Sequence, residues 1–438
     1  YQAGEDLGTS PANVQFDAVN YDRDTAAVNW SIGSEQVGNV PPDSITLTTP
    51  ADYRIYQRNG SNQASVTLSG VYSDEGAGAI EYRFAGGAWT TLVASPAGGV
   101  FSQAVTLSQG QGTLSVRLAS DTAITDSAAF IGIGDIFLIA GQSNAEGRLT
   151  NDQTYFHASL KPVVYDEDDM AWRDCVDPTD NDSTDGSIWP LFATLLMADQ
   201  SVPVGFITTA EGGTGITTDW KPTVTVGPKY TACLNRITAV GPNDIKAMIL
   251  DQGETDATNS VSGSDYNTAL DNLVANLQSA SGITFPAIVD LVGYVSPAGT
   301  LDAIRDAQID AWDDNPDIFP GANSITRAGL HWTTDNEAGT FAALLWVAVD
   351  EALYGGPSAR GPRLVAATTT SGTSVVNLAF DRELLASDSA YTSTAFTVTN
   401  GAGTPRTVNS VTRVSSDDVQ VTLSGPLDGA SPTVTFGS

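Results

Sequence analysis

Positive charge, sulfur and histidine are scarce in this chain. Its 438 residues include 19 Lys and Arg against 51 Asp and Glu, which gives a formal net charge of −32. A surface of this sign repels phosphate backbones and anionic lipid headgroups, so we expect neither a nucleic-acid partner nor a membrane partner. With only three Met and two His, the chain also offers little basis for a transition-metal site.

Long apolar runs are missing too. No stretch reaches the roughly 18 apolar residues that a membrane-spanning helix needs, and the longest candidate, 128–140, is interrupted by Asp135. The chain begins with Tyr1 rather than Met, which is typical of a processed or trimmed product and compatible with a lost export signal. Cys175 and Cys233 fit neither a CxxC redox motif nor a zinc knuckle. One disulfide and two free buried thiols are equally compatible with this spacing.

The composition changes twice along the chain and predicts three domains. Residues 1–132 contain short alternating apolar and polar runs separated by turns, which predict an all-β sandwich. Residues 133–356 alternate apolar strands with helical stretches, as in a central α/β domain with a doubly wound parallel sheet. After a Pro- and Gly-rich linker, residues 363–438 return to short strands and resemble an immunoglobulin-like β-sandwich.

Four short blocks in the central region carry the candidate chemistry. In the first, 141–144, Ser143 stands on the turn that leaves an apolar run, where a nucleophile is expected. Turn glycines let the backbone approach a reacting carbonyl, and nearby N–H groups can stabilise the oxygen on which charge develops. The other blocks also follow strand-like runs or precede a helical stretch, where open α/β sheets place active sites; they are 208–214, 251–256 and 329–333.

In this order, the four blocks resemble the sialate O-acetylesterase and acetylxylan-esterase branch of the SGNH (GDSL-type) hydrolases. The likeness covers residues 133–355 and implies a flavodoxin-like three-layer fold. It also implies Ser143 as the nucleophile and His331 as the general base. The backbone N–H groups of Ser143 and of Gly213, or its neighbour Gly212, would donate to the oxyanion.

The small number of histidines independently supports His331 as the general base. The only other histidine, His157, lies in an aromatic cluster with no turn signature, where packing or a place at the rim is the simpler interpretation. His331 instead follows an irregular segment that contains Gly and Asn. Ser–His chemistry needs one such imidazole to accept the serine proton.

One position departs from the family in a way that affects the chemistry. The family carries Asp three residues before the histidine, and here that residue is Ala328. Loss of the acid partner lowers turnover by about 10⁴ where nothing replaces it. Glu254 is the first candidate replacement, and Asp335 and a main-chain carbonyl near Arg327 are alternatives. Glu254 and Asp256 could instead be solvated loop carboxylates or helix N-caps.

The block 251–256 also lacks the oxyanion Asn of the wider superfamily, because Thr255 stands at that position. Gln252 carries a side-chain amide and is the candidate substitute donor. Arg305 is a candidate substrate contact, with a surface patch of i,i+3 side chains on a helix as the alternative. The substrate contacts we expect are Gln142, Asn144, Trp220, Arg305 and Trp332.

The acidic stretches 166–169 and 177–186 offer oxygen ligands, but their spacing does not fit a calcium loop, so we expect no metal site. The sequence therefore predicts a carbohydrate O-acetylesterase that needs no cofactor and acts outside the cell or on a cell or virion surface. Its partner would be an O-acetylated glycan or polysaccharide. The sequence identifies neither the sugar nor the oligomeric state of the protein. The competing hypothesis is a glycan-binding, adhesin or tail-spike module on an inactive esterase scaffold, for which Ala328 is the main support.

Overall fold

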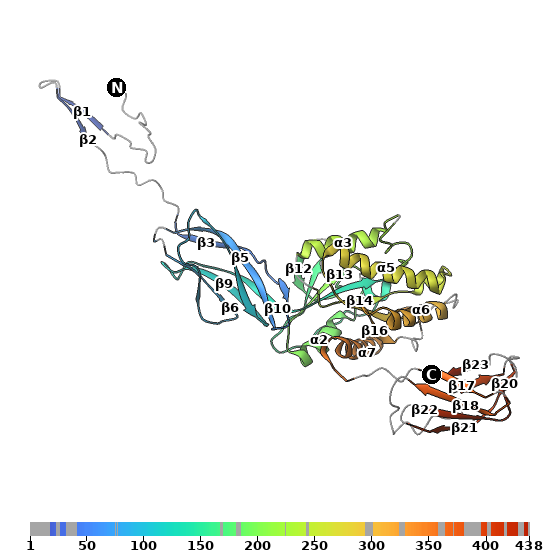
Figure 1. Ribbon diagram of the computed structural model, residues 1–438. Helices are drawn as coiled ribbons and strands as arrows, with labels where there is room; N and C mark the ends of the chain where they lie inside the picture. Colours follow the sequence, from blue (N-terminus) through green and yellow to red (C-terminus); the bar gives the residue numbers. More distant parts are fainter. Residues whose placement is uncertain are drawn as a thin grey trace.

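The computed structural model of the protein combines large sheets with a smaller number of helices, and the predicted mixed α/β class is confirmed (Figure 1). The residues it describes are 18–22, 27–31, 42–74, 76, 78–166, 170–180, 185–223, 225–241, 245–293, 301–323, 329–357, 364–370, 372–380, 396–400, 404–415, 418–427 and 433–436.

The central sheet places its strands in the order β12-β11-β13-β10-β14-β15-β16. Neighbours pair in parallel from β11 to β16, whereas β12 pairs antiparallel with β11. The carboxyl ends of parallel strands share one edge, so the blocks that follow β10, β13 and β14 meet there. The bounds are β10 (Thr125–Gly141), β11 (Val163–Asp166), β12 (Ala171–Asp174), β13 (Val204–Thr208), β14 (Ala247–Asp251), β15 (Ala287–Leu291) and β16 (Ile318–Asn323).

Helices cover both faces of this sheet (Figure 1). Successive side chains of a strand point to opposite faces, and in β10 Ile136 and Leu138 join one buried cluster while Phe137 and Ile139 join another. The first cluster includes side chains of α3, α5 and α6, and the second includes side chains of α2 and α7. These helices are α2 (Trp189–Gln200), α3 (Pro228–Val240), α5 (Gly263–Ser281), α6 (Leu301–Asp314) and α7 (Asp335–Tyr354).

The N-terminal strands continue directly into the central sheet through β10. The first part of this strand pairs with β9 and β4, and the second part pairs with β13 and β14. The predicted boundary at 132/133 therefore falls inside a strand. A separate three-stranded sheet has the order β3-β5-β8, and β1 pairs with β2. Their bounds are β1 (Ala18–Asp22), β2 (Ala27–Ser31), β3 (Ser44–Thr49), β4 (Ile55–Gln57), β5 (Gln63–Ser73), β6 (Ile80–Phe84), β7 (Thr90–Val93), β8 (Val100–Ser108) and β9 (Gly110–Leu118).

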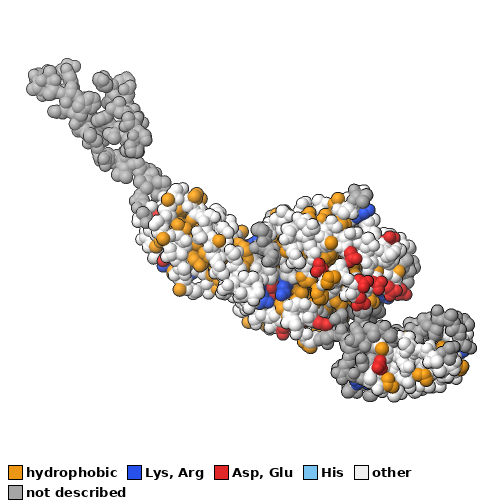
Figure 2. All heavy atoms as spheres, in the orientation of Figure 1, with side chains coloured by type: hydrophobic (Ala, Val, Ile, Leu, Met, Phe, Trp, Pro, Cys, Tyr) orange, Lys and Arg blue, Asp and Glu red, His pale blue; other side chains and the backbone are white. Residues whose placement is uncertain are grey.

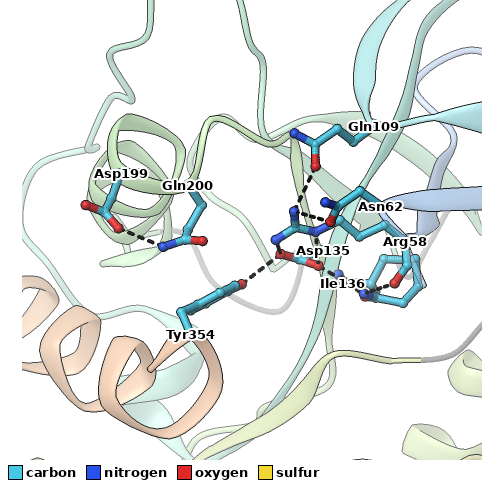
Figure 3. A network of polar contacts seen from close by, with 9 residues as sticks. Arg58, Asn62, Gln109, Asp135, Ile136, Asp199, Gln200 and Tyr354 are labelled. Atoms are coloured by element: carbon cyan, nitrogen blue, oxygen red, sulfur yellow. Dashed lines mark hydrogen bonds and ion pairs between the residues drawn. The ribbon is translucent and has the colours of Figure 1, made fainter. Parts of the chain in front are cut away.

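Asp135 joins the N-terminal strands to the last helix of the central region (Figure 3). Its carboxylate is fully buried and accepts from Arg58 Nη2 at 2.9 Å, Gln57 Nε2 at 3.0 Å and the Tyr354 hydroxyl at 2.8 Å. A buried charge is tolerated where it is paired and hydrogen-bonded in this way. The residue that interrupts the apolar run 128–140 in the sequence is thus the polar centre of a junction between β4, β10 and α7.

The C-terminal strands form two further sheets, one with the order β17-β18-β22-β21 and one with the order β20-β19-β23. The immunoglobulin-like module stays a prediction, and most of the linker before it, 358–363, lies outside the described residues, as do 381–382. The bounds are β17 (Leu364–Thr369), β18 (Val375–Phe380), β19 (Phe396–Thr399), β20 (Pro405–Arg406), β21 (Val408–Arg413), β22 (Asp418–Leu423) and β23 (Thr433–Phe436).

Acidic side chains outnumber basic ones on the face of the central region seen in Figure 2. On α6, four exposed aspartates recur every fourth residue and therefore lie along one side of the helix: Asp302, Asp306, Asp310 and Asp314. Within the described ranges, no helix is both long and apolar enough to span a membrane.

Both cysteines are free and buried, which agrees with the second of the two alternatives that the sequence left open. Burial raises the pKa of the Cys233 thiol to about 12 and places that of Cys175 well above its usual value. Neither thiol therefore has the thiolate character of a reactive cysteine.

Candidate active site

Ser143 and His331 come together at the carboxyl edge of the central sheet. Ser143 begins α1 (Ser143–Glu146), directly after β10, and His331 lies in the segment between β16 and α7. The Ser143 Oγ and His331 Nε2 atoms are 3.0 Å apart, although 188 positions separate the residues in sequence. This is hydrogen-bond distance between a hydroxyl and an imidazole, as nucleophile activation by a general base requires.

The turn that presents Ser143 requires glycine before it. Gly141 has φ +132°, and a Cβ at this position would lie 2.1 Å from the Asp251 carbonyl oxygen. The next residue, Gln142, donates its N–H to the same carbonyl at 3.0 Å. The close approach of β10 to β14 therefore sets the direction in which the chain leaves the sheet and positions Ser143 at its carboxyl edge.

A cavity of about 350 Å³ opens over the serine and histidine. All four sequence blocks contribute to its wall, so the structure brings together the segments that the sequence singled out. The lining residues are Gln142, Ser143, Arg148, Gly212, Gly213, Glu254, Thr255, Thr258, Asn259, Leu330 and His331.

Of the two glycines proposed for the oxyanion site, Gly213 is the better placed. The Gly212 N–H already donates to Glu146 Oε2 at 2.7 Å. Gly213 lies in the cavity wall with φ +77°, and no described residue accepts a hydrogen bond from its N–H. The Ser143 N–H, at the first turn of α1, also lacks an acceptor in the described part of the chain. These two N–H groups are the candidate donors.

Gln252 does not supply a third donor, and its predicted oxyanion role is wrong for this arrangement. The residue is completely buried and is absent from the cavity wall. Its Nε2 atom donates to the Thr214 carbonyl at 3.2 Å and to Asp256 Oδ2 at 2.6 Å, which uses both amide hydrogens. The side chain thus connects the loops after β13 and β14 beneath the cavity.

Glu254 is buried, lines the cavity and is held close to the histidine segment. Its Oε1 accepts from Asn144 Nδ2 at 3.0 Å, and the same nitrogen donates to the Leu330 carbonyl at 3.1 Å. Asn144 therefore connects the nucleophile turn, the glutamate and the residue before His331. The role of Glu254 as acid partner stays a prediction. The position of the missing family aspartate, Ala328, lies outside the described residues, as does Arg327.

Asp256 and Asp335, which the sequence offered as a loop carboxylate or helix cap and as an alternative acid partner, each make other contacts. Asp256 is buried and accepts from the Ile216 N–H at 2.8 Å and the Thr217 hydroxyl at 2.9 Å, so it is neither solvated nor a helix cap. Asp335 accepts from Gln153 Nε2 at 3.0 Å and is not part of the cavity wall. Each of these aspartates holds a loop in place.

Asp290 was not singled out from the sequence, where it interrupts the apolar run 287–292. Its Oδ1 accepts from the Ala322 N–H at 2.5 Å, whereas Oδ2 has no hydrogen-bond partner in the described part of the chain. Burial, with the nearby charges of Asp251 and Glu254, holds the pKa of Asp290 well above its usual value. The raised pKa favours the protonated form of this carboxyl, which lies near two other acidic groups.

Two aromatic residues expected to contact substrate belong to the core. Trp220 is completely buried and donates from Nε1 to the Thr214 hydroxyl at 3.1 Å. Trp332 is 8% exposed and stacks on Phe341 with ring centroids 4.7 Å apart. Neither ring lines the cavity, so the prediction that they bind substrate is wrong. The hydrophobic effect places both rings among apolar neighbours.

Arg305 and Asn144 also contact protein rather than the cavity. Arg305 Nε donates to the Val292 carbonyl at 2.9 Å, and its Nη2 donates to the Gly293 carbonyl, so the guanidinium holds the backbone that follows β15. Asn144 is 4% exposed. Of the predicted substrate contacts, Gln142 alone lies in the cavity wall. Its Oε1 accepts from the Thr255 N–H at 3.2 Å.

His157 lies away from this site. Its Nδ1 accepts from the N–H groups of Ser159 at 3.2 Å and Leu160 at 2.9 Å, so the ring stabilises a local turn. Among the described residues, no group of three or more His, Cys, Asp or Glu side chains is arranged to hold a metal ion. Parts of the acidic stretches, 167–169 and 181–184, lie outside those residues.

Comparison with known proteins identifies the region that carries this site. Residues 133–339 match the family model described as carbohydrate esterase, sialic acid-specific acetylesterase. The resemblance inferred from the four blocks is confirmed. A probable carbohydrate esterase of Arabidopsis thaliana is 24% identical over 195 residues, which cover 40% of this chain and 74% of that protein.

One solved structure is similar over most of the chain. It is the crystal structure of a carbohydrate acetylesterase from Xanthomonas citri, with a TM-score of 0.61 and 18% sequence identity. The match covers 90% of this chain and 94% of the other. At this identity the likeness shows a shared fold.

Proposed function

We propose that this protein removes acetyl groups from the hydroxyls of a glycan or polysaccharide through an acetyl-enzyme intermediate on Ser143. The observation that carries the proposal is the distance of 3.0 Å between Ser143 Oγ and His331 Nε2 inside the cavity. The family match of the surrounding residues 133–339 supports an ester of a carbohydrate as the substrate.

In the proposed reaction, His331 Nε2 accepts the hydroxyl proton as Ser143 Oγ attacks the acetyl carbonyl. The carbonyl oxygen becomes an oxyanion and accepts hydrogen bonds from the N–H groups of Ser143 and Gly213. Collapse of the tetrahedral intermediate releases the sugar hydroxyl, which takes the proton from His331. Water then attacks the acetyl-enzyme with His331 again as the base, and acetate leaves.

An acid partner for the imidazole completes the proposal. Glu254 is its candidate, because Asn144 holds it beside the backbone of Leu330, which directly precedes His331. A carboxylate in that place would orient the ring and stabilise the imidazolium that forms in the transition state. Two further wall residues, Thr258 and Asn259, offer polar groups that suit sugar hydroxyls.

We also propose the finer description of the fold and its setting. The central region would be a doubly wound, flavodoxin-like three-layer domain, supported by the two clusters on opposite faces of β10. The flanking strands would form β-sandwich domains that position the enzyme on an extracellular polysaccharide or on a cell or virion surface. The inactive-scaffold alternative gains no support from a cavity that retains Ser143, His331 and Gly213.

The test is acetate release by the purified chain from an aryl acetate and from acetylated xylan, sialosides and bacterial polysaccharides. We expect turnover of the aryl acetate and of at least one carbohydrate. The Ser143→Ala variant should fold normally and lose activity by on the order of 10⁶. Retention of more than about one per cent of the activity would show that Ser143 is not the nucleophile.

A further inference from the structure

A buried carboxylate lies directly behind the nucleophile turn. Glu146, the last residue of α1, is 2% exposed. Its Oε2 atom accepts two hydrogen bonds, one from the Gly212 N–H at 2.7 Å and one from Arg148 Nη2 at 2.7 Å. One oxygen atom therefore joins the helix that carries Ser143 to the glycine loop across the cavity.

Gly212 is packed closely against this ion pair. A Cβ on Gly212 would lie 2.7 Å from Arg148 Nη2, 2.9 Å from Glu146 Oε2 and 3.4 Å from the Cβ of Ser143. No side chain fits between the loop and the pair, so the loop position follows that of Glu146 and Arg148. Gly213, the candidate oxyanion donor, is the next residue and shares a peptide bond with Gly212.

The charges of Glu146 and Arg148 have opposite effects on the energy of the oxyanion that forms in the reaction. An unpaired carboxylate next to the oxyanion site would raise the energy of the developing negative charge. Arg148 neutralises that carboxylate through Nη2, while its Nη1 donates to the Gly147 carbonyl at 2.8 Å. Arg148 is also one of the residues that line the cavity.

We propose that Glu146 and Arg148 are positioning residues for the oxyanion site. Glu146 holds the Gly212 N–H and thereby orients the Gly213 N–H toward the cavity, and Arg148 keeps the Glu146 charge paired. The inference rests on the proposed ester hydrolysis. Neither residue belongs to the four sequence blocks, yet together they fix the distance between the nucleophile and the second oxyanion donor.

The first arm of the test removes the acceptor. With an aryl acetate, Glu146→Ala should lower kcat by about 10- to 100-fold with KM within about threefold, because a displaced donor acts on the transition state. Glu146→Gln keeps an acceptor oxygen and should recover most of the loss. The inhibition constant of an aryl boronic acid, which forms a tetrahedral anion on the serine, should rise in parallel with the loss of kcat.

The second arm separates positioning from direct substrate contact. Arg148→Met leaves the Glu146 charge unpaired and should lower kcat. The double variant Glu146→Gln with Arg148→Met should then be at least about fivefold more active than Arg148→Met alone, since the repelling charge is gone. If Arg148 acted by contacting substrate, the second substitution would restore nothing, which would overturn the proposed role of Arg148.

The matched control is the Glu81–Arg117 pair in the N-terminal strands, whose charged atoms are also 2.7 Å apart. Glu81→Ala should leave kcat and boronic-acid inhibition unchanged. A wild-type chain with no esterase activity overturns the proposed function and this inference together. An active wild type with full activity in Glu146→Ala overturns this inference alone. Should Glu146→Ala fail to fold, Glu146→Gln and the double variant still decide the outcome.

Discussion

Polar groups are buried near both ends of the β10 segment in the central sheet, but the two sets differ in how completely they are hydrogen-bonded. At the N-terminal end, both carboxylate oxygens of Asp135 accept hydrogen bonds, from Arg58 and Tyr354 (Figure 3) and from Gln57. At the carboxyl edge of the sheet, several buried oxygen atoms on α1, on β15 and directly after β14 have no hydrogen-bond partner in the described part of the chain: Asn144 Oδ1, Asp290 Oδ2 and Gln252 Oε1. A satisfied polar network stabilises a fold, whereas a partly satisfied one destabilises it. We infer that the junction serves stability and that the carboxyl edge serves chemistry.

Replacement of His331 is expected to give the largest effect, and it tests whether the carboxyl edge serves chemistry. His331→Ala should lower turnover of an aryl acetate by on the order of 10⁶ while leaving the unfolding midpoint nearly unchanged, because it removes the base but little packing. His157→Ala is the matched control, and its turnover should equal that of the wild type. Initial rates and urea titrations measure both effects. Loss of activity in the His157 variant alone would place the site elsewhere.

The acid partner gives the next largest effect. If Glu254 orients His331, Glu254→Gln should lower turnover by about 10² to 10⁴ with little change in KM, since the lost interaction strengthens as imidazolium forms. Asp335→Asn removes the alternative carboxylate and should retain turnover. A loss below tenfold in Glu254→Gln, measured with saturating aryl acetate, would favour a main-chain carbonyl as the partner.

At the junction the expected effect is on folding instead. Asp135→Ala leaves the guanidinium of Arg58, whose side chain is 13% exposed, without its carboxylate. Breaking a buried pair from one side typically lowers the free energy of unfolding by about 3–5 kcal/mol. Glu81→Ala, in a more exposed pair, should lower it by less than about 1 kcal/mol. Urea denaturation measures both. Equal effects in the two variants would contradict a special role for the junction.

The smallest expected effect is a gain in stability at neutral pH when Asp290, near the carboxyl edge, is replaced by asparagine. The pKa of Asp290 is raised by burial and by Asp251 and Glu254, so the folded state keeps a proton that the unfolded chain releases above about pH 4. The contribution of Asp290 to the free energy of unfolding therefore decreases as the pH rises from about 4 toward the pKa of Asp290 in the folded protein. Asp290→Asn should flatten this slope and raise the free energy of unfolding at pH 7 by roughly 1 kcal/mol.

At pH 4 the unfolding midpoints of the asparagine variant and the wild type should differ far less than at pH 7, because the unfolded chain still keeps about half of the Asp290 proton at that pH and the folded protein, with its raised pKa, keeps most of it. A wild-type stability that rises between pH 4 and pH 7 more steeply than that of Asp290→Asn would show that the carboxyl ionises in the folded protein. Comparing the two variants at both pH values isolates Asp290 from the other acidic groups.

Sequence reasoning succeeded where strand order and chain direction decide position. The segments of Ser143, Gly213, Glu254 and His331 all line one cavity, because parallel strands bring their carboxyl ends to a common edge. It failed where the direction of a side chain decides the contact. Gln252 and Trp220 stand beside two of these segments, yet both side chains are completely buried beneath them.

By itself, the sequence determined the mixed α/β class, the family resemblance of the central region and the segments that meet at the site, because apolar period, turn glycines and block order are local properties of the chain. Only the tertiary structure decided which polar atoms face the cavity. Glu146 reaches Gly212, and Asp135 reaches Tyr354, across 66 and 219 positions of sequence. Such contacts follow from how loops and helices pack in three dimensions, and no local pattern encodes them.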